Sequence, residues 1–216
     1  PTGLEGDPLV SIAELPDGDG SDLSLGLLSS DGRFKRLPMS EVLDLSGRAT
    51  SVVKLKEGVE LASALICREH SDLVLVSDLG RILRLPVNES TLPLMGRLAQ
   101  GPMTMRLLPG EQLVGALCIN VAEQDPTLFM VSGKGRMTRL DITPLRRCQR
   151  GDLGCMGVNL GSDDDRIRGI SNSDALIGLI SDRGRHGRLE TGETALSSLG
   201  GCLLYTSDAA DEVAWG

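Results

Sequence analysis

The chain has 216 residues, a formal net charge of −8 and an apolar fraction of 40%. Only 2% of the residues are Phe, Trp or Tyr, which disfavours sugar sites and single-strand nucleic-acid platforms because both rely on aromatic stacking. The apolar runs are shorter than the ~18 residues that a membrane helix requires, so we expect no membrane partner.

The five cysteines are predicted to be free thiols. Their number is odd, no Cys-x-x-Cys pair occurs, and only His70 and His186 accompany them. A reducing cytosol fits this pattern better than a disulfide framework or a metal site does. We therefore expect a cytoplasmic chain that itself holds no metal and no other cofactor.

One nine-residue pattern, Ser-x-x-Gly-Arg-x-x-Arg-Leu, occurs four times, at residues 29–37, 77–85, 132–140 and 181–189. The glycines of successive copies lie 48, 55 and 49 residues apart, a period typical of propellers and solenoids. The chain is therefore predicted to be an array of similar units.

Each unit is predicted to begin with a β-hairpin. A short apolar run leads into a turn that carries Gly, and a second short strand follows, as in residues 23–28 and 33–37. A polar loop with Gly and Arg comes after the hairpin. Two further strands then complete each of the first three units, over residues 52–55 with 60–66, 103–107 with 112–119, and 155–160 with 166–170.

Four short strands per period, without helical periodicity, predict an all-β fold of propeller-like blades packed around an axis. We expect about four four-stranded blades, the last one incomplete, near residues 23–71, 72–126, 127–173 and 174–201. Residues 1–22 are expected to be a partial leading segment of a fragment, because no Met begins the chain. Residues 202–216 match no repeat and resemble a translated sequencing-library adaptor, so we expect them to be non-native.

Arginine supplies 18 of the 22 basic residues, and its distribution is regular. Eight arginines occupy the two Arg positions of the four motifs, and a second group lies in the polar loops after the hairpins. Acidic residues instead crowd the connections. The run Asp163–Asp165 is expected to be a solvated turn, because consecutive acids lack the alternate spacing of a calcium loop.

The hairpin segment 32–41, Gly-Arg-Phe-Lys-Arg-Leu-Pro-Met-Ser-Glu, resembles the signature Gly-Tyr-Gly-Lys-Arg-Thr-Pro-Leu-Ser-Glu in the C-terminal repeats of the bacterial gyrase A and topoisomerase IV A subunits. Residues 93–101 are similar to the Arg- and Gly-rich segment after that hairpin, and residues 107–116 to the closing strands. The resemblance covers residues 20–201. It implies a β-pinwheel, in which neighbouring blades exchange a strand and a basic outer rim bends duplex DNA.

The resemblance also implies a wider setting. The parent would be a type IIA topoisomerase of the bacterial cytoplasm and nucleoid, using ATP and Mg²⁺ through other domains, whereas this chain would be non-catalytic. Its partners would be double-stranded DNA, the remaining A-subunit domains and the ATPase B subunit. Residues 149–154 match the gyrase box Gln-Arg-Arg-Gly-Gly-Lys-Gly without one Arg, one Gly and the Lys, so a topoisomerase IV-like and a divergent gyrase-like subunit both stay open.

Bending DNA requires phosphate contacts along an arc, and arginine suits them because its planar fork can hold phosphate oxygens in pairs. The candidate DNA contacts are Arg33, Lys35, Arg36, Arg48, Arg81, Arg84, Arg97, Arg136, Arg139, Arg146, Arg147, Arg150, Arg185 and Arg188. The two arginines of a motif lie three positions apart and face opposite sides of an ideal strand, so we expect only one to reach DNA. The other could tie blades together or pair with an acid such as Glu41 or Glu89.

Two alternatives stay open. Surface arginines also solvate strand edges and deter aggregation without binding anything. A propeller can also serve as a protein-interaction scaffold, which would present an apolar or mixed patch on its top face in place of arginines on one outer edge.

Overall fold

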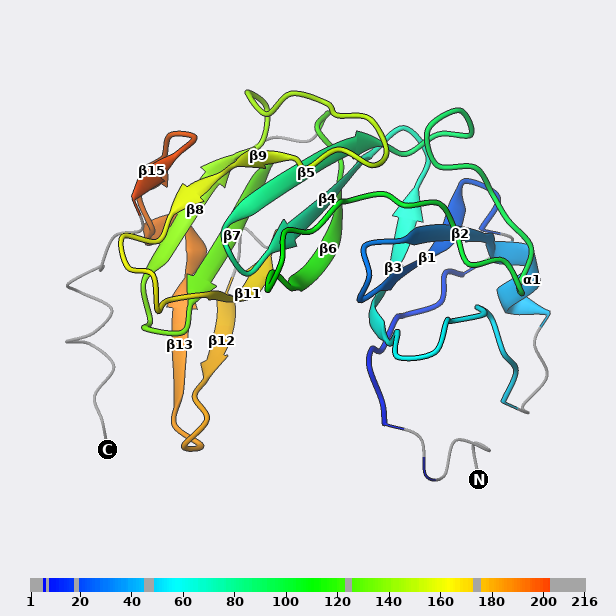
Figure 1. The fold of residues 1–216 in the computed structure, drawn as a ribbon, viewed down its shortest axis with the longest axis horizontal. Helices are drawn as coiled ribbons and strands as arrows, with labels where there is room; N and C mark the ends of the chain where they lie inside the picture. Colours follow the sequence, from blue (N-terminus) through cyan, green and yellow to red (C-terminus); the bar gives the residue numbers. More distant parts are fainter. Residues whose placement is uncertain are drawn as a thin grey trace.

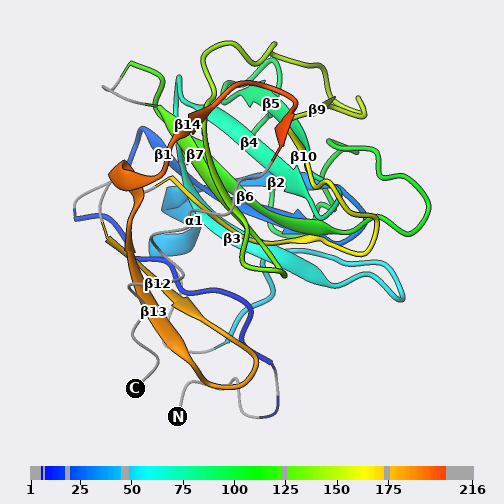
Figure 2. The ribbon, with the colours of Figure 1, turned by 90° about the vertical axis from the view of Figure 1, so that its left-hand side faces the viewer.

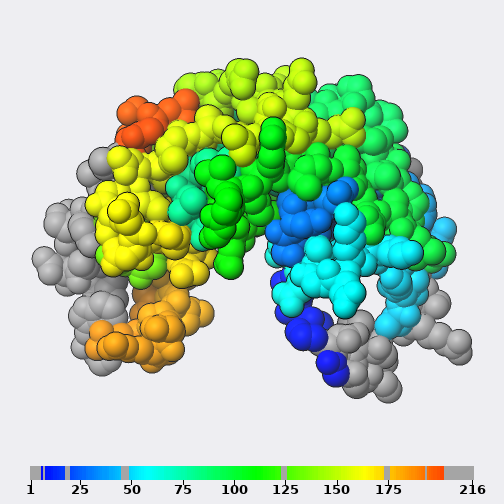
Figure 3. Space-filling view, viewed as in Figure 1, coloured from blue at the N-terminus to red at the C-terminus, as the bar shows by residue number. Residues whose placement is uncertain are grey.

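The computed structural model describes residue 6 and residues 8–17, 20–44, 49–122, 126–172 and 176–202. Its strands form successive β-sheets along an open arch, which the chain follows from one leg to the other (Figure 1). The space-filling view shows the same arch, hollowed on its concave side (Figure 3).

Three sheets make up most of the arch, and we call them blades 1, 2 and 3. Blade 1 has the strand order β2-β1-β3, with β1 (Leu23–Ser29), β2 (Phe34–Pro38) and β3 (Leu61–Arg68). Blade 2 has the order β6-β4-β5-β9, with β4 (Asp72–Ser77), β5 (Arg81–Pro86), β6 (Leu113–Ile119) and β9 (Cys155–Met156). Blade 3 has the order β11-β7-β8-β14, with β7 (Thr127–Ser132), β8 (Met137–Asp141), β11 (Ile167–Ser171) and β14 (Leu196–Ser197).

The fourth unit is incomplete, as the repeat pattern predicted. Its hairpin of β12 (Leu176–Ile180) and β13 (His186–Glu190) forms a two-stranded sheet within the described part of the chain, and it projects from one leg of the arch (Figures 1 and 2). Farther along, β15 (Gly201–Cys202) pairs in parallel with β10 (Val158–Asn159). Residues 203–216, most of the tail expected to be non-native, lie outside the described residues.

The outermost strand of each blade comes from the next unit of the chain. Strand β9 follows the third hairpin but pairs with β5 of blade 2, and β14 follows the fourth hairpin but pairs with β8 of blade 3. In blade 1, bridges from Leu94 to Arg36 and from Met103 to Arg33 bring the segment after the second hairpin onto the outer edge of the sheet. This strand exchange confirms the β-pinwheel.

Three details of the sequence prediction are wrong. Met103 and residues 155–156, from two segments expected to complete their own units, pair with the preceding hairpin instead. A hydrophobic pattern indicates a strand but does not determine the strand with which it pairs. Residues 52–55 form no strand. The short helices α1 (Met39–Leu43) and η1 (Thr191–Glu193) were not predicted, since five and three residues are too few to show a helical period.

The glycine of the first motif shows why the exchange requires Gly. Gly32 has a φ of +85°, and a Cβ there would lie 2.0 Å from the carbonyl oxygen of Met105 in the exchanged segment. The backbone N–H groups of Thr104 and Met105 both donate to the Gly32 carbonyl, at 2.9 and 3.0 Å. Gly therefore supplies both the turn conformation and the close approach of the next unit.

The core consists of aliphatic layers between blades. Along β4 the side chains alternate, so that Leu73 and Leu75 pack in the layer shared with blade 1, and Val74 and Val76 in the layer shared with blade 3. All six residues of β4 are buried. A central blade is therefore apolar on both faces, which explains the imperfect alternation of its strands.

Candidate nucleic-acid interface

The second arginine of the first motif points into the protein. The Arg36 side chain is fully buried, donates to the carbonyl of Leu92 and pairs with Glu69. Its Nη2 also lies 3.7 Å from Oε2 of Glu89, one of the two acids considered as an alternative partner. Because Leu92 and Glu89 belong to the second unit, Arg36 ties two successive units together.

Arg84 repeats this arrangement one unit later. Its Nε and Nη2 donate to Oδ2 of the buried Asp72 at 3.0 and 2.7 Å. Its Nη1 donates to the carbonyl oxygens of Ile142 and Leu145, at 2.7 and 2.9 Å, on the segment that follows the third hairpin. In the third copy, Nη1 of Arg139 lies 3.5 Å from the carbonyl oxygen of Thr191, again in the next unit.

The first arginines of the motifs also have protein partners. Arg81 donates to Glu111 at 2.8 Å and to the carbonyl of Leu153 in the exchanged segment. Arg33, a quarter exposed, pairs with Asp31 at 3.2 Å and donates to the carbonyl of Gly101 at 3.1 Å. In the first three copies, both motif arginines thus contact protein groups, and most of these groups belong to another unit.

One acid that the sequence predicted to be solvated is buried. Asp165 is buried and pairs with Arg136 at 3.1 Å, so the run Asp163–Asp165 is not a wholly solvated turn. The exposed neighbour Asp164 pairs with Lys134, and the hydrogen bond from Lys134 lowers the pKa of Asp164 to about 2. The run therefore anchors the hairpin turn of the third unit.

Lys35 takes no part in an exposed cationic surface. The Lys35 side chain is buried, and its Nζ donates to the carbonyl of Val52 at 2.7 Å. Burial lowers the pKa of Lys35, while the nearby Glu41 acts in the opposite direction. Arg48 lies outside the described residues.

The remaining candidates are exposed, and the structure divides them into two places. One group lies on the loops that carry the exchanged segments along the outside of the arch (Figure 1), and consists of Arg97, Arg146, Arg147 and Arg150. The other group, Arg185 and Arg188, belongs to the β12–β13 hairpin. Two exposed loop arginines also touch carboxylates: Arg147 donates to Asp72 at 2.9 Å, and Arg97 lies 3.8 Å from Glu41.

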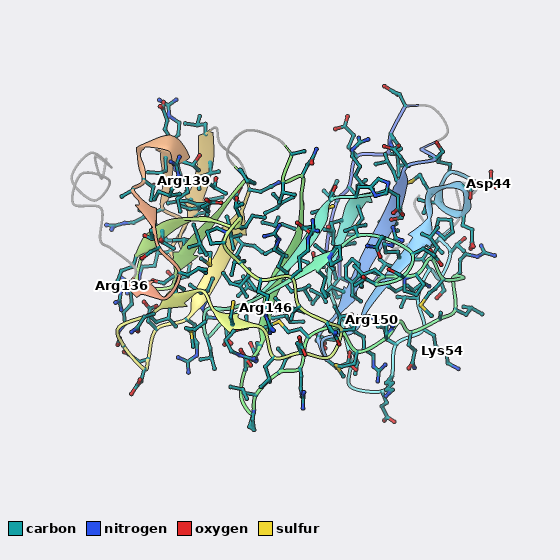
Figure 4. All side chains as sticks on the ribbon, turned by 90° about the horizontal axis from the view of Figure 1, so that it is seen from above. Asp44, Lys54, Arg136, Arg139, Arg146 and Arg150 are labelled. Atoms are coloured by element: carbon teal, nitrogen blue, oxygen red, sulfur yellow. The ribbon has the colours of Figure 1, made fainter. Side chains whose placement is uncertain are left out.

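We call the outside of the arch, over the loops that carry the exchanged segments, the crest. The labelled Arg146 and Arg150 lie on the same loop there (Figure 4). Lys54, which was not predicted as a contact, is also exposed, on the segment that leads into β3 in the leg of blade 1 (Figures 1 and 4). Arg106 is also exposed on an exchanged segment and was missed. A comparison of the segments after each hairpin could have found both, because Lys54 and Arg106 lie four residues before Gly58 and Gly110, respectively.

The crest is distinguished by its exposed loop cations rather than by a metal-binding cluster. Within the described ranges, no group of three or more His, Cys, Asp or Glu residues is placed to hold a metal ion. The helices in those ranges are all too short to cross a membrane. What the crest offers a partner is a set of exposed guanidinium groups.

The sequence is similar to a family of known proteins. Residues 27–68, 71–120 and 126–174 match the family described as "DNA gyrase C-terminal domain, beta-propeller". The DNA gyrase A subunit of Aminobacterium colombiense is 31% identical over 189 residues, which are 85% of this chain and 22% of that protein. The DNA topoisomerase 4 A subunit of Synechocystis is 30% identical over 65% of this chain and 16% of that protein. The chain thus spans less than a quarter of these relatives.

Solved structures agree with the fold. The C-terminal domain of a DNA topoisomerase IV matches with a TM-score of 0.74 and 18% identity, over 90% of this chain and 61% of that domain. The C-terminal domain of a DNA gyrase A matches with a TM-score of 0.71 and 20% identity, over 89% of this chain and 64% of that domain. The family match covers well over half of the chain, and the chain therefore belongs to the family of the C-terminal β-propeller domain of DNA gyrase A.

Proposed function

We propose that the chain binds duplex DNA along the crest of the arch, without sequence preference, and bends it. The observation that carries this proposal is the repeated placement of exposed arginines on the loops of the exchanged segments, with Arg97 in the second unit and Arg146 and Arg150 in the third. Contacts on successive loops of a curved surface would hold a duplex in a bent path.

Phosphate binding explains how an acidic chain can hold DNA. Each arginine that neutralises a phosphate releases condensed counterions, and this gain is local to the contact, so it does not require a positive net charge. Such contacts position a duplex but do not read its sequence. Together they must offset a bending cost of roughly 1–6 kcal/mol over 20–30 base pairs.

The motif arginines have a different role in this proposal. Their hydrogen bonds to carbonyl groups of the next unit, such as those of Arg84 to Ile142 and Leu145, fix the exchanged segments on the outer edges of the blades. Because the DNA-facing loops belong to these segments, the motif arginines of the first three copies position the contacts without making them. Arg185 and Arg188 of the exposed hairpin remain proposed contacts.

The relatives suggest the setting of this activity. We infer that the parent is a type II topoisomerase of the bacterial cytoplasm, acting at the nucleoid, in which this part delivers DNA to a cutting and resealing core. That core would use ATP and Mg²⁺ through other domains and would include an ATPase B subunit together with the rest of the A subunit. The aligned relatives, which are A subunits of a gyrase and of a topoisomerase 4, support this inference.

A protein-interaction scaffold is the second candidate. Its support is the exposed apolar surface of the fourth hairpin, where Ile180 is 80% and Leu176 49% exposed. A scaffold of this kind would bind its partner through the hairpin and would not require the crest arginines.

Fluorescence anisotropy with a labelled duplex of about 30–40 base pairs, at several salt concentrations, tests the DNA proposal. We expect the logarithm of the binding constant to fall linearly with the logarithm of the salt concentration. Duplexes of unrelated sequence should bind with equal affinity. Fluorescence energy transfer between dyes at the two duplex ends should rise on binding as the ends approach. Absent or salt-insensitive binding would support the scaffold instead.

A further inference from the structure

Two cysteines of neighbouring blades face each other. Cys67 lies on β3 opposite Ser24 of β1, and Cys118 lies on β6 opposite Leu73 of β4. Strands β3 and β6 pack side by side on the inner side of the arch (Figure 1). Because Leu73 packs in the layer between blades 1 and 2, its strand partner Cys118 points into the same layer, which also contains Cys67.

The surroundings of the Cys118 sulfur favour a thiolate. The Cys67 thiol, the backbone N–H of Arg68 and the Ser71 hydroxyl all form hydrogen bonds to it. The bond from Cys67 is the largest influence and, against the opposing effects of burial and Asp72, helps to lower the pKa of Cys118 to about 6. The same contact and burial raise the pKa of Cys67, with Arg36 lowering it and Glu69 raising it to smaller extents.

The two thiols also differ in access. Cys67 is fully buried, whereas Cys118 is partly exposed. A small oxidant can therefore reach Cys118 first, with Cys67 beside it. This is the arrangement of a reactive thiol and a resolving thiol.

We propose that Cys118 and Cys67 form a peroxide-responsive pair that closes to a disulfide between blades 1 and 2. The Cys118 thiolate attacks one oxygen of hydrogen peroxide, the O–O bond breaks, and hydroxide leaves, so that Cys118 becomes a sulfenic acid. The Cys67 sulfur then attacks the Cys118 sulfur, the S–O bond breaks, and the hydroxyl leaves as water with the Cys67 proton. The two sulfurs lose two electrons in total, and one peroxide is reduced to one hydroxide and one water.

Cys148 and Cys155 provide an internal comparison. Cys155 is exposed, but partial burial of its sulfur raises its pKa, with the neighbouring Cys148 acting in the same direction. Cys148 is buried, and its sulfur lies 3.6 Å from the carbonyl oxygen of Arg146. Exposure alone would make Cys155 the first site of oxidation, whereas thiolate character selects Cys118.

The test uses the whole chain treated with a small molar excess of hydrogen peroxide near pH 7, followed by intact-mass measurement and non-reducing peptide mapping. We expect the loss of two hydrogen atoms, one linked peptide pair that contains Cys67 and Cys118, and full reversal by dithiothreitol. The oxidised chain should melt roughly 5–15 °C higher, because the new crosslink closes a loop of about 50 residues.

Single variants separate the steps. Cys67→Ala should leave the Cys118 sulfenic acid unresolved and open to trapping by dimedone, and Cys118→Ala should form no disulfide. The matched control Cys155→Ala should still form it. A wild-type chain that forms no disulfide, that links Cys148 to Cys155, or that is oxidised first at Cys155 overturns the proposal, and this result does not depend on how well the variants fold.

Discussion

The guanidinium of Arg84 and the carboxylate of Asp72 form an ion pair inside the protein, with Nη2 2.7 Å from Oδ2 and both side chains almost fully buried. Arg84 also binds carbonyl groups of the third unit, and Arg147 from that unit binds the other oxygen of Asp72 at 2.9 Å. One buried pair therefore joins two successive repeat units at the outer edge of a blade.

Arg84→Ala should lower the free energy of unfolding by about 2–4 kcal/mol, because it removes one of the two arginines that pair with the buried Asp72 and leaves carbonyl groups of the third unit without their donor. Urea unfolding followed by circular dichroism measures this change. Arg146→Ala, at an exposed position, is the matched control and should change stability by no more than about 0.5 kcal/mol. Equal effects for the two variants would contradict a structural role of Arg84.

Gly32→Ala should destabilise the chain more than Gly135→Ala. Both glycines occupy the same motif position, with φ values of +85° and +77°, so the backbone strain of an Ala is similar. A Cβ at residue 32 would collide with the exchanged segment, whereas one at residue 135 would meet nothing within 4 Å. We expect a difference of at least about 1 kcal/mol in unfolding free energy, and its absence would argue against close docking of residues 103–105.

Stability should fall at low pH partly through Glu111. Burial raises the pKa of this carboxyl, but hydrogen bonds from Arg81 and the Leu108 backbone N–H help to lower it overall. A carboxyl with a lowered folded-state pKa stabilises the fold above its unfolded pKa of about 4.3, and this contribution disappears as the pH falls through the folded value. Glu111→Gln should therefore show a smaller loss of stability than the wild type as the pH falls from about 5 into acid conditions. If stability depends on pH in the same way in Glu111→Gln and in the wild type, Glu111 does not contribute to the loss of stability in acid.

Alkylation by iodoacetamide should distinguish the thiols. The rate at Cys118 should reach half its maximum near pH 6, because only the thiolate reacts and its pKa is about 6. Cys155, whose pKa is raised, should reach its half-maximum above the ordinary value for a cysteine. Peptide mapping after short exposures over a pH series gives both curves, and coincident curves would contradict the assigned surroundings of Cys118.

The sequence predicted the repeat, the hairpins and the incomplete last unit, because Ser-x-x-Gly-Arg-x-x-Arg-Leu marks a local turn between two short strands. It did not predict which sheet receives residues 155–156, because pairing between units depends on the path of the chain across the arch. For the same reason, tying blades together was only one of several roles expected of the motif arginines. The partners of Arg36 include Leu92, which lies 56 residues away in the chain.

The exposure of the candidate contacts was predicted in part. The loop arginines Arg97, Arg146 and Arg150 are exposed, as expected of residues in polar loops without an apolar pattern. Lys35 looked equivalent to its neighbours in the sequence, yet it is buried, since the exchanged segment covers its strand. Lys35 is buried by residues of the next unit, so its burial cannot be predicted from the residues around it in the sequence.

The crest is tested most directly by comparing the salt dependence of DNA binding for two variants. The first is a double variant, Arg146→Ala/Arg150→Ala, which removes two exposed arginines from the crest. The second, Arg168→Ala, removes one exposed arginine from β11, on the inner side of the arch. We predict that the double variant binds a duplex more weakly at every salt concentration, with a slope of log affinity against log salt reduced by about 2, while Arg168→Ala matches the wild type. A double variant with unchanged affinity and slope, or an equal loss in Arg168→Ala, would contradict DNA binding along the crest.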